Sequence, residues 1–316
     1  MNIKKNEMAK TKILIAGIGG VGGYFGGLMA KQFYNNDTVD IYFLARGKHL
    51  EEIQTNGLKI VKDNNELICK PDLATDKPSE IGYVDFIILC TKSYDLESTI
   101  QKLQICITYE TIILPLLNGV DNRERIKKIL PNNLVLDGCV YIVSRLTQAG
   151  RVENYGKTEK LYFGLDNFEN EKLIQLEQLF KLSNIDATLS KNISTIIWEK
   201  FIFISPTATA TSYYDSTAGA ILSPPEKLNT FNKLIEEVSL IAKAKKITIN
   251  KNIIDKTLNT MKSLPLETTS SMHFDFQNKK PHTELNSLTA YVVNEGKKYN
   301  IMTPTYDRLF KELKKK

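Results

Sequence analysis

Near its beginning the sequence contains the run Lys12-Ile13-Leu14-Ile15-Ala16-Gly17-Ile18-Gly19-Gly20-Val21-Gly22. An apolar, strand-like stretch leads directly into glycines spaced Gly-x-Gly-x-x-Gly, and a helical stretch, residues 24–33, follows. In a dinucleotide-binding turn the first glycine makes the tight turn, the second lets the backbone approach a pyrophosphate, and the third lets the helix pack on the strand. The context therefore favours a dinucleotide site over an ordinary glycine-rich turn, with the pyrophosphate at the helix N-terminus.

The second predicted strand, residues 39–44, ends in a loop that carries two cations. NAD sites usually have an acidic residue at the end of this strand, bonded to the ribose 2′-hydroxyl. Here Arg46 and Lys48 follow the strand, and Asp40 lies at its start, which is the wrong end of the sheet. Because guanidinium binds phosphate in a planar, bidentate way, Arg46 favours NADP over NAD. The alternative is that both cations are only solvated loop charges.

Length and composition narrow the class of protein. A chain of 316 residues favours two domains over one. The net charge of +6 suits anionic ligands, and the basic residues are too dispersed for a nucleic-acid binder. No segment reaches the roughly 18 apolar residues of a membrane span, and the polar start does not resemble a signal peptide. We expect a cytoplasmic protein, and Met8 is a candidate native start because the first strand begins just after it.

Cysteines and histidines give no sign of a metal site. The four cysteines lack the spacing of a metal-binding pair, which predicts free thiols in a reducing compartment. The three histidines, His49, His273 and His282, are not spaced like metal ligands either. We therefore assign no metal to this chain.

Two kinds of periodicity divide the chain. Strand-like runs at 13–16, 39–44, 84–90, 111–116 and 135–143 alternate with helical stretches that include 93–104 and 121–129, which predicts a parallel sheet with helices on both faces. A hairpin is expected at 58–61 and 66–70, and further strands, antiparallel in arrangement, at 150–152 and 161–164. Beyond about residue 190 only helical spacing remains. The prediction is a Rossmann-type, doubly wound α/β domain at 8–190 followed by an all-helical domain at 191–316.

Lys200 lies on the apolar stripe of a predicted helix, because positions 193, 197, 200, 204 and 208 follow the helical period. A lysine there either extends its ammonium to solvent or takes part in chemistry. Burial would lower its pKa, since desolvation disfavours the charged form. Such a lysine can give a proton to a carbonyl oxygen during hydride transfer.

Other polar residues lie where ligands often bind. Asn118 and Lys92 each follow a predicted strand, at the carboxyl edge of the sheet, although Asn118 also suits a plain Asn-Gly turn. Ser271 and Asp275 precede Glu284, which falls in the first turn of another helix. The alternatives are structural: Ser270 and Ser271 could equally cap a helix or turn, and the helix dipole alone favours a carboxylate in a first turn.

In this order the motifs resemble those of the ketopantoate reductases (2-dehydropantoate 2-reductases). The resemblance covers nearly the whole chain from Lys12 and rests on the segments Gly17–Gly22, 44–47, 90–92, 117–120, 198–200, 270–272 and 282–284 and on Asp275. It implies NADPH-dependent reduction of 2-dehydropantoate to pantoate, a step in making pantothenate and coenzyme A.

The resemblance also implies roles for individual residues. It makes Lys200 the general acid and Glu284 its partner carboxylate. It places Asn118, Ser271 and Asp275 at the substrate. The cofactor set that it implies, together with the glycine motif, is Gly17, Ile18, Gly19, Gly20, Val21, Gly22, Arg46, Lys92, Asn118 and Glu284. The hydride would pass in a cleft between the two domains.

One departure from the family pattern concerns the helix of Lys200. Family members usually carry asparagines four and eight residues after the lysine, and here these positions are Ile204 and Ala208. Nearby hydroxyls could take over from them; these belong to Ser205, Thr207, Thr209 and Thr211. Two alternatives therefore stay open: an NADP-dependent reductase of a different small 2-oxo acid or imine, and a non-catalytic NADP-sensing protein. The sequence leaves a homodimer open.

Overall fold

The computed structural model describes residues 10–316, so the first two residues of the predicted first domain, Met8 and Ala9, lie outside the described residues. The contacts within the chain divide it into two compact units. The first unit comprises the chain up to Thr91, Asp95–Leu117 and Asn122–Ile193. The second unit comprises Lys92–Tyr94, Asn118–Asp121 and Ser194–Lys316. Two short segments that follow strands of the first unit in the chain thus belong to the second.

The first unit is built around a five-stranded parallel sheet. Its strands, in spatial order, are β5 (Leu73–Thr75), β2 (Val39–Leu44), β1 (Thr11–Ala16), β6 (Phe86–Leu89) and β7 (Ile112–Pro115). All neighbouring pairs are parallel, and Ile15 in β1 pairs with Phe43 on one side and Ile88 on the other. This order matches the first five strands of a dinucleotide-binding sheet. The Rossmann-type prediction is confirmed.

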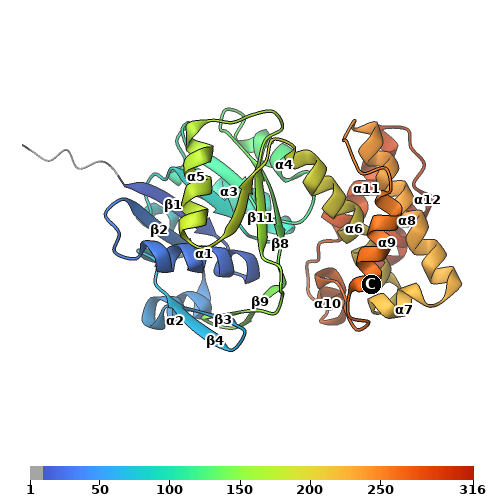
Figure 1. Ribbon diagram of the computed structural model, residues 1–316, viewed down its shortest axis with the longest axis horizontal. Helices are drawn as coiled ribbons and strands as arrows, with labels where there is room; N and C mark the ends of the chain where they lie inside the picture. Colours follow the sequence, from blue (N-terminus) through green and yellow to red (C-terminus); the bar gives the residue numbers. More distant parts are fainter. Residues whose placement is uncertain (1–9) are drawn as a thin grey trace, which may run out of the picture. The chain divides into compact units, whose positions relative to one another are not determined.

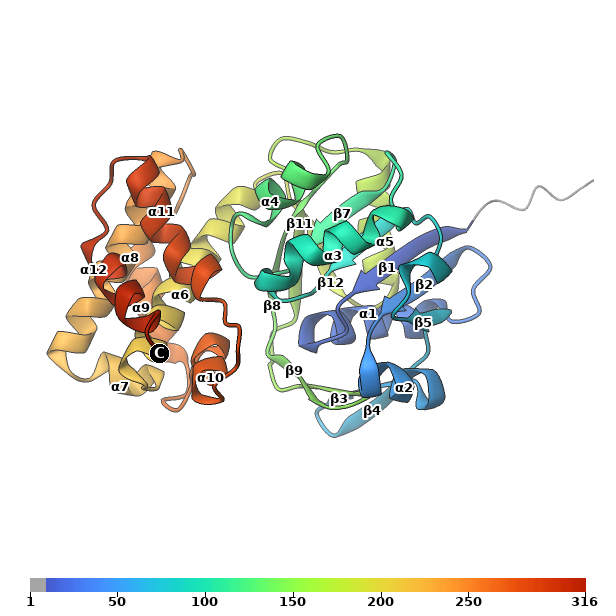
Figure 2. The same ribbon diagram turned by 180° about the vertical axis from the view of Figure 1, so that it is seen from behind.

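Helices cover both faces of this sheet, as Figures 1 and 2 show. One face carries α1 (Gly20–Phe33) and α5 (Glu171–Leu182), and the other carries α3 (Leu96–Leu103) and α4 (Asn122–Ile129). Successive side chains of a strand point to opposite faces. Ile13 and Ile15 therefore join the core under α1 and α5, whereas Leu14 and Ala16 join the core under α3 and α4.

Short elements complete this sheet. Helix α2 (Gly47–Asn56) follows β2, and three short helical turns are η1 (Pro78–Glu80), η2 (Ser93–Asp95) and η3 (Gln104–Cys106). The single helix predicted at 93–104 is therefore α3 with a tighter turn at each end. Of these turns η2 overlaps the segment that belongs to the second unit.

Two smaller sheets lie in the first unit. One has the order β4 (Asn65–Cys69), β3 (Leu58–Lys62), β10 (Arg151–Asn154) and β9 (Ser144–Gln148), and the other has the order β12 (Asp186–Leu189), β11 (Lys160–Gly164) and β8 (Asp137–Tyr141). The predicted β3–β4 hairpin is confirmed, and its turn residues Asp63 and Asn64 have φ of 49° and 64°. The predicted strands at 150–152 and 161–164 exist. Each is antiparallel to one neighbour and parallel to the other, so the antiparallel prediction is right for one side only.

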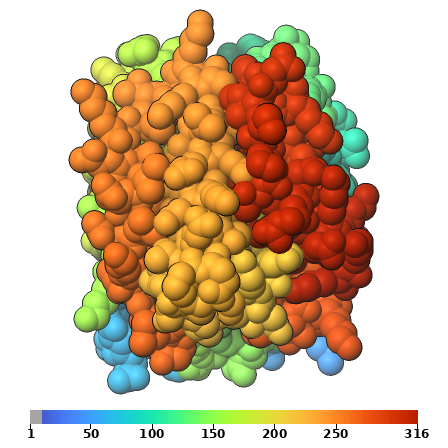
Figure 3. All heavy atoms as spheres, turned by 90° about the vertical axis from the view of Figure 1, so that its right-hand side faces the viewer, coloured from blue at the N-terminus to red at the C-terminus, as the bar shows by residue number. Residues whose placement is uncertain are grey.

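The second unit is helical. Its elements are α6 (Ile193–Tyr214), α7 (Ala218–Leu222), α8 (Pro225–Ala244), α9 (Ile253–Ser263), α10 (Ser271–Gln277), a π-helical turn η4 (Asn286–Ala290), α11 (Tyr291–Lys298) and α12 (Pro304–Leu313). Within the described residues no strand follows β12, which confirms the all-helical prediction. Helix α8 packs against α9, α11 and α12, and Figure 3 shows it in light orange between the orange and red segments. Between residues 10 and 316 no helix combines the length and the hydropathy needed to cross a bilayer.

Candidate functional site

The glycine-rich turn between β1 and α1 is shaped by close packing at all but one of its glycines. Gly17 has φ of +96°, which a residue with a side chain rarely adopts. A Cβ at Gly20 would lie 2.1 Å from the carbonyl oxygen of Ser144, and one at Gly22 would lie 2.2 Å from that of Gly17. A Cβ at Gly19 would have no neighbour within 4 Å. The protein thus leaves space open at the second glycine of the motif, where a pyrophosphate approaches the backbone in such turns.

The N-terminus of α1 offers donors to that space. Gly19 is the N-cap residue, and no side chain caps this end of the helix. The first backbone N–H groups of an α-helix have no partner inside the helix, and together with the helix dipole they bind anions. The hydroxyl of Thr91, two residues after β6 and next to Gly17, is buried and has no hydrogen-bond partner within the described residues. These features fit the pyrophosphate of a dinucleotide.

The loop after β2 presents Arg46 to solvent. The Arg46 side chain is 85% exposed, with the carboxylate of Asp95 3.9 Å away. Asp40 accepts hydrogen bonds from Lys10 Nζ at 2.9 Å and Tyr42 Oη at 3.2 Å, at the start of β2. The structure therefore places no carboxylate of β2 beside this loop, and Arg46 keeps its guanidinium accessible.

His49 in α2 contacts the glycine-rich turn, which the sequence reasoning missed. Its Nε2 lies 2.7 Å from the carbonyl oxygen of Ile18, and its Nδ1 accepts the backbone N–H of Gly150 at 2.9 Å. Burial lowers the pKa of His49, and the bond to Ile18 offsets part of this shift. His49 lies only three residues after Arg46, and this closeness to a predicted cofactor residue is the sequence signal that could have identified it.

Lys200 and Asn118 meet in the second unit. Nζ of Lys200, on α6, donates a hydrogen bond to Oδ1 of Asn118 at 3.1 Å, in the segment that follows β7. Lys200 is partly buried, and Gly119 beside the asparagine has φ of +109°. The two residues are 82 positions apart in the chain, and the fold brings these two predicted site residues into contact.

A second polar cluster gathers two buried carboxylates around Lys92. Nζ of Lys92 lies 3.3 Å from Asp275 and 3.7 Å from Glu284, and both carboxylate side chains are 3% exposed. Lys280 binds the other oxygen of Asp275 at 2.8 Å, and Ser271 Oγ lies 3.5 Å from Glu284. Burial by itself lowers the pKa of Lys92, but the charges of Glu284 and Asp275 outweigh it and hold the pKa above its usual value. The predicted cofactor residue Lys92 thus sits among predicted substrate and catalytic residues.

The hydroxyls that could have taken over from the missing asparagines make other hydrogen bonds in the structure. Ser205 Oγ donates to the carbonyl oxygen of Leu288 at 2.6 Å, and Thr209 Oγ1 lies 2.8 Å from Thr289 Oγ1. Thr207 and Thr211 bond to backbone carbonyl oxygens one turn earlier in α6. That interpretation is wrong, because these side chains are buried in contacts within the helical unit. Ala208 is 2% exposed and part of the core, whereas Ile204 stays partly accessible.

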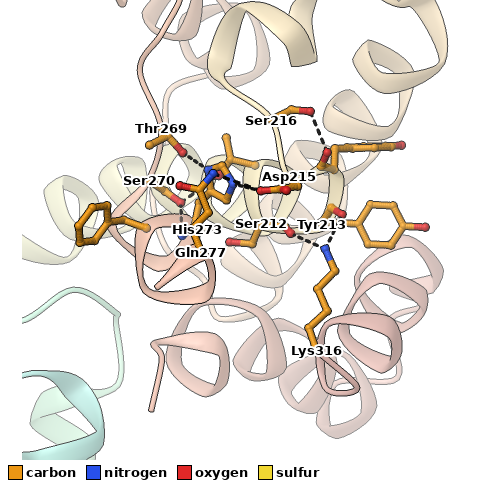
Figure 4. A network of polar contacts seen from close by, with 12 residues as sticks. Ser212, Tyr213, Asp215, Ser216, Thr269, Ser270, His273, Gln277 and Lys316 are labelled. Atoms are coloured by element: carbon orange, nitrogen blue, oxygen red, sulfur yellow. Dashed lines mark hydrogen bonds and ion pairs between the residues drawn. The ribbon is translucent and has the colours of Figure 1, made fainter. Parts of the chain in front are cut away.

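A network at the start of α10 fixes the helix that carries Ser271 and Asp275 (Figure 4). Nε2 of His273 lies 2.6 Å from Asp215 Oδ1, and its Nδ1 contacts Thr269 Oγ1. Ser270 caps the helix by accepting the backbone N–H of His273 at 3.0 Å. The bond to His273 holds the pKa of Asp215 below its usual value. The sequence identified Ser270 as a candidate cap, but not the pairing of His273 with Asp215.

Residues 10–316 hold no cluster of three or more histidine, cysteine or acidic side chains that could bind a metal ion. The four cysteines, Cys69, Cys90, Cys106 and Cys139, are free thiols.

Comparisons with known proteins give consistent results. A family model described as ketopantoate reductase PanE/ApbA matches residues 13–167, and the model of its C-terminal part matches residues 192–316. The crystal structure of a 2-dehydropantoate 2-reductase from Porphyromonas gingivalis W83 is 33% identical with a TM-score of 0.84, covering 96% of this chain and 99% of that one. An uncharacterized oxidoreductase, YkpB of Bacillus subtilis, is 28% identical over 303 residues, covering 96% of this chain and 97% of its own. A 2-dehydropantoate 2-reductase of Streptococcus pyogenes is 27% identical over 303 residues, covering 95% and 96% of the two chains.

Proposed function

Since the chain belongs to the ketopantoate reductase family, we propose that it reduces 2-dehydropantoate to pantoate with NADPH, in the cytoplasm, as a step towards pantothenate and coenzyme A. Family membership makes it an oxidoreductase that takes a nicotinamide cofactor. The observation that carries the proposal is the pairing of Lys200 with Asn118. In this proposal residues 8–190 bind the cofactor and residues 191–316 supply the general acid. A homodimer is compatible with this scheme.

The cofactor contacts follow from the first unit. The backbone of Gly17–Gly22 would receive the pyrophosphate at the open position beside Gly19. Arg46 would bind the ribose 2′-phosphate, because its guanidinium is exposed and offers paired donors. When bound, NADPH supplies a hydride to the ketone carbon of the substrate.

Proton transfer falls to Lys200 in this proposal. As hydride reaches the carbonyl carbon, negative charge grows on the carbonyl oxygen, and an ammonium group in contact with that oxygen gives it a proton. Asn118 accepts a hydrogen bond from Nζ, which fixes the position of the ammonium group on α6. The products are the 2-hydroxy acid and NADP⁺.

The cluster around Lys92 has a supporting role. Its ammonium balances the two buried carboxylates, which would otherwise repel an anionic 2-oxo acid. Glu284 lies against Ser271, and the hydroxyl of Ser271 is the group that we assign to the substrate. The negative charges of Asp275 and Glu284 also favour the protonated form of lysine side chains around them. In this way Glu284 would help to keep Lys200 protonated as the acid.

Replacing Arg46 tests the choice between NADPH and NADH. We expect Arg46→Ala to raise the KM for NADPH about tenfold, since the paired charge-assisted hydrogen bonds of an exposed guanidinium are lost. The KM for NADH should change little, because NADH lacks the 2′-phosphate. Steady-state kinetics with both cofactors measures this, and an equal change for NADPH and NADH would assign Arg46 a role other than phosphate binding.

The direct test of the function is oxidation of NADPH by the purified chain in the presence of 2-dehydropantoate. The panel should include other 2-oxo acids, and NADH should be run in parallel. NADPH-selective turnover of 2-dehydropantoate is the expected result. Turnover of another 2-oxo acid in its place would keep the reaction type and change the substrate. Tight NADPH binding without turnover of any substrate would favour a sensing role.

Ile204 favours a second candidate function. It lies one turn after Lys200 on α6, is partly accessible, and brings an apolar side chain to a position where the family usually has an amide. Ala208, a further turn on, is buried in the core and offers no polar atom. A reductase of a more apolar 2-oxo acid, or of an imine, suits this surface. The panel separates the two candidates if it includes 2-oxo acids with branched aliphatic and aromatic side chains.

A further inference from the structure

His49 joins three separate parts of the first unit. Its ring lies on α2, three residues after Arg46, and it bonds to Ile18 in the glycine-rich turn and to Gly150 in the turn between β9 and β10. A backbone N–H can only donate, so Nδ1 must be unprotonated to accept the N–H of Gly150. A carbonyl oxygen can only accept, so Nε2 must carry the proton that it gives to Ile18. The two partners therefore require the neutral imidazole in one tautomer.

The bond to Ile18 fixes a peptide at the centre of the turn. In a trans peptide the carbonyl oxygen and the following N–H point in opposite directions. With the oxygen of Ile18 held by His49, the N–H of Gly19 must point away from the ring. Gly19 is the residue whose surroundings are open to a ligand. The orientation of this peptide determines whether the Gly19 N–H can serve as an anion donor.

We propose that His49 is a positioning residue for the dinucleotide: its neutral ring clamps the glycine-rich turn to the Gly150 turn, and protonation of the ring releases that clamp and weakens cofactor binding. The inference rests on the NADP site of the proposed function and adds a residue and a pH response to it. His49 itself does not need to touch the cofactor.

The cationic side chains near His49 and Gly150 are held in ion pairs, so they do not account for the proposed pH response of His49. Glu52 lies on the same helix beside Gly150, and Lys59 and Arg151 extend from β3 and β10. The two cations are held in ion pairs with Glu66, and Arg151 also pairs with Glu153. Burial is the main cause that lowers the pKa of His49. The ring is therefore neutral above the usual imidazole pKa of about 6.5, and it takes up a proton only as the pH falls below that value.

The sign of the pH effect follows from linkage. A group whose pKa is depressed in the folded, cofactor-competent state must be neutral for that state to persist. The two hydrogen bonds of His49 make their full contribution to cofactor affinity above about pH 6.5. This contribution is lost as the pH falls through the lowered pKa of His49. Binding of the proton and binding of the dinucleotide thus weaken each other.

The test measures the Kd of NADP⁺ for the full chain at several pH values between about 8 and about 5. This range spans the usual imidazole pKa, and NADP⁺ is used because it is stable in acid. Two variants separate the two bonds. The amide of His49→Gln reaches the place of Nε2 and can still donate to Ile18, whereas the amide of His49→Asn reaches the place of Nδ1 and can still accept from Gly150. Near pH 8 we expect the Kd to rise less than about threefold for Gln and about 3–10-fold for Asn, as expected for the loss of one hydrogen bond.

The pH dependence of the Kd decides whether protonation of His49 controls cofactor binding. As the pH falls, the wild-type Kd should rise more steeply than that of either variant, so that the ratio of variant to wild type shrinks towards one. Titration of the cofactor phosphates affects all proteins alike and cancels in this ratio. His282→Gln is the matched control, since His282 is exposed and lies against Tyr94 in the second unit, and it should follow the wild type.

Three results would overturn the proposal. A constant ratio across the pH range, even with a lower melting temperature for the variants, would make His49 a purely structural residue. A wild-type affinity that improves relative to the variants at low pH would mean that His49 attracts the phosphates as a cation. If neither wild type nor variants bind NADP⁺ at any pH, the cofactor assignment itself fails, and this is distinguishable from the first two results.

Discussion

Lys200→Ala should lower kcat about 10²–10⁴-fold, the range that a positioned general acid contributes. The ammonium on α6 is the proton donor in the proposed reaction, and alanine leaves Asn118 without that donor. Water can still protonate the product oxygen, which is why we expect residual activity. The Kd of NADPH should change far less than kcat, because the proposed contacts to the cofactor phosphates at Gly17–Gly22 and Arg46 belong to the other unit.

Two further variants separate proton transfer from charge and folding. Lys200→Arg keeps a positive charge, but guanidinium gives up a proton far less readily, so kcat should remain low while substrate binding recovers. Lys243→Ala removes an exposed lysine from α8 and should behave like the wild type. Single-turnover kinetics with a fixed amount of NADPH isolates the chemical step. If Lys200→Ala turns over at the wild-type rate, Lys200 is not the acid.

Four strands of the central sheet could be predicted because their signals are local, whereas the run at 135–143, predicted in the same parallel sheet, forms β8 in a smaller sheet, antiparallel to β11. Buried parallel strands are continuous apolar runs, and the glycine motif fixes which strand is first. Strand β5 was missed, since it has only three residues at the sheet edge. The neighbours of β10 and β11 could not be predicted, because one partner of each lies far away in the sequence and no local pattern reports a parallel pairing.

The candidate site also has features that the sequence predicted and features that it did not. Periodicity and the family pattern pointed to Lys200 and Asn118 as site residues, with Glu284 as the partner of Lys200. The fold brings Lys200 to Asn118, and Glu284 lies 3.7 Å from Lys92. These patterns did not predict that Lys92 would lie between two buried carboxylates, because ion pairing across 183 positions depends on the tertiary fold. The hydroxyls of α6 were misjudged for a related reason. Helical spacing tells which residues share a face, but not whether that face meets a ligand or another helix.

Gly22→Ala should destabilise the protein by about 3 kcal/mol, whereas Gly19→Ala should leave its stability nearly unchanged and weaken NADPH binding. At Gly22 the new Cβ would lie 2.2 Å from the Gly17 carbonyl oxygen and 2.8 Å from Cys90 Cβ, so backbone must move. Alanine is the better helix former by about 1 kcal/mol, and this gain is smaller than the cost of the clash. Differential scanning calorimetry compares the two variants with the wild type.

The expected behaviour of Gly19→Ala comes from open space rather than from packing. Nothing in the protein lies within 4 Å of its Cβ, and φ of −90° is accessible to alanine. An N-cap alanine costs up to about 1 kcal/mol, partly offset because alanine restricts the unfolded chain. The methyl group would, however, occupy the place that we propose for the pyrophosphate, and we expect the Kd of NADPH to rise at least about tenfold, equivalent to about 1.4 kcal/mol. Wild-type affinity in a stable Gly19→Ala protein would mean that the dinucleotide does not bind at this turn, whereas weak binding with an unchanged melting temperature would assign the open space to the pyrophosphate.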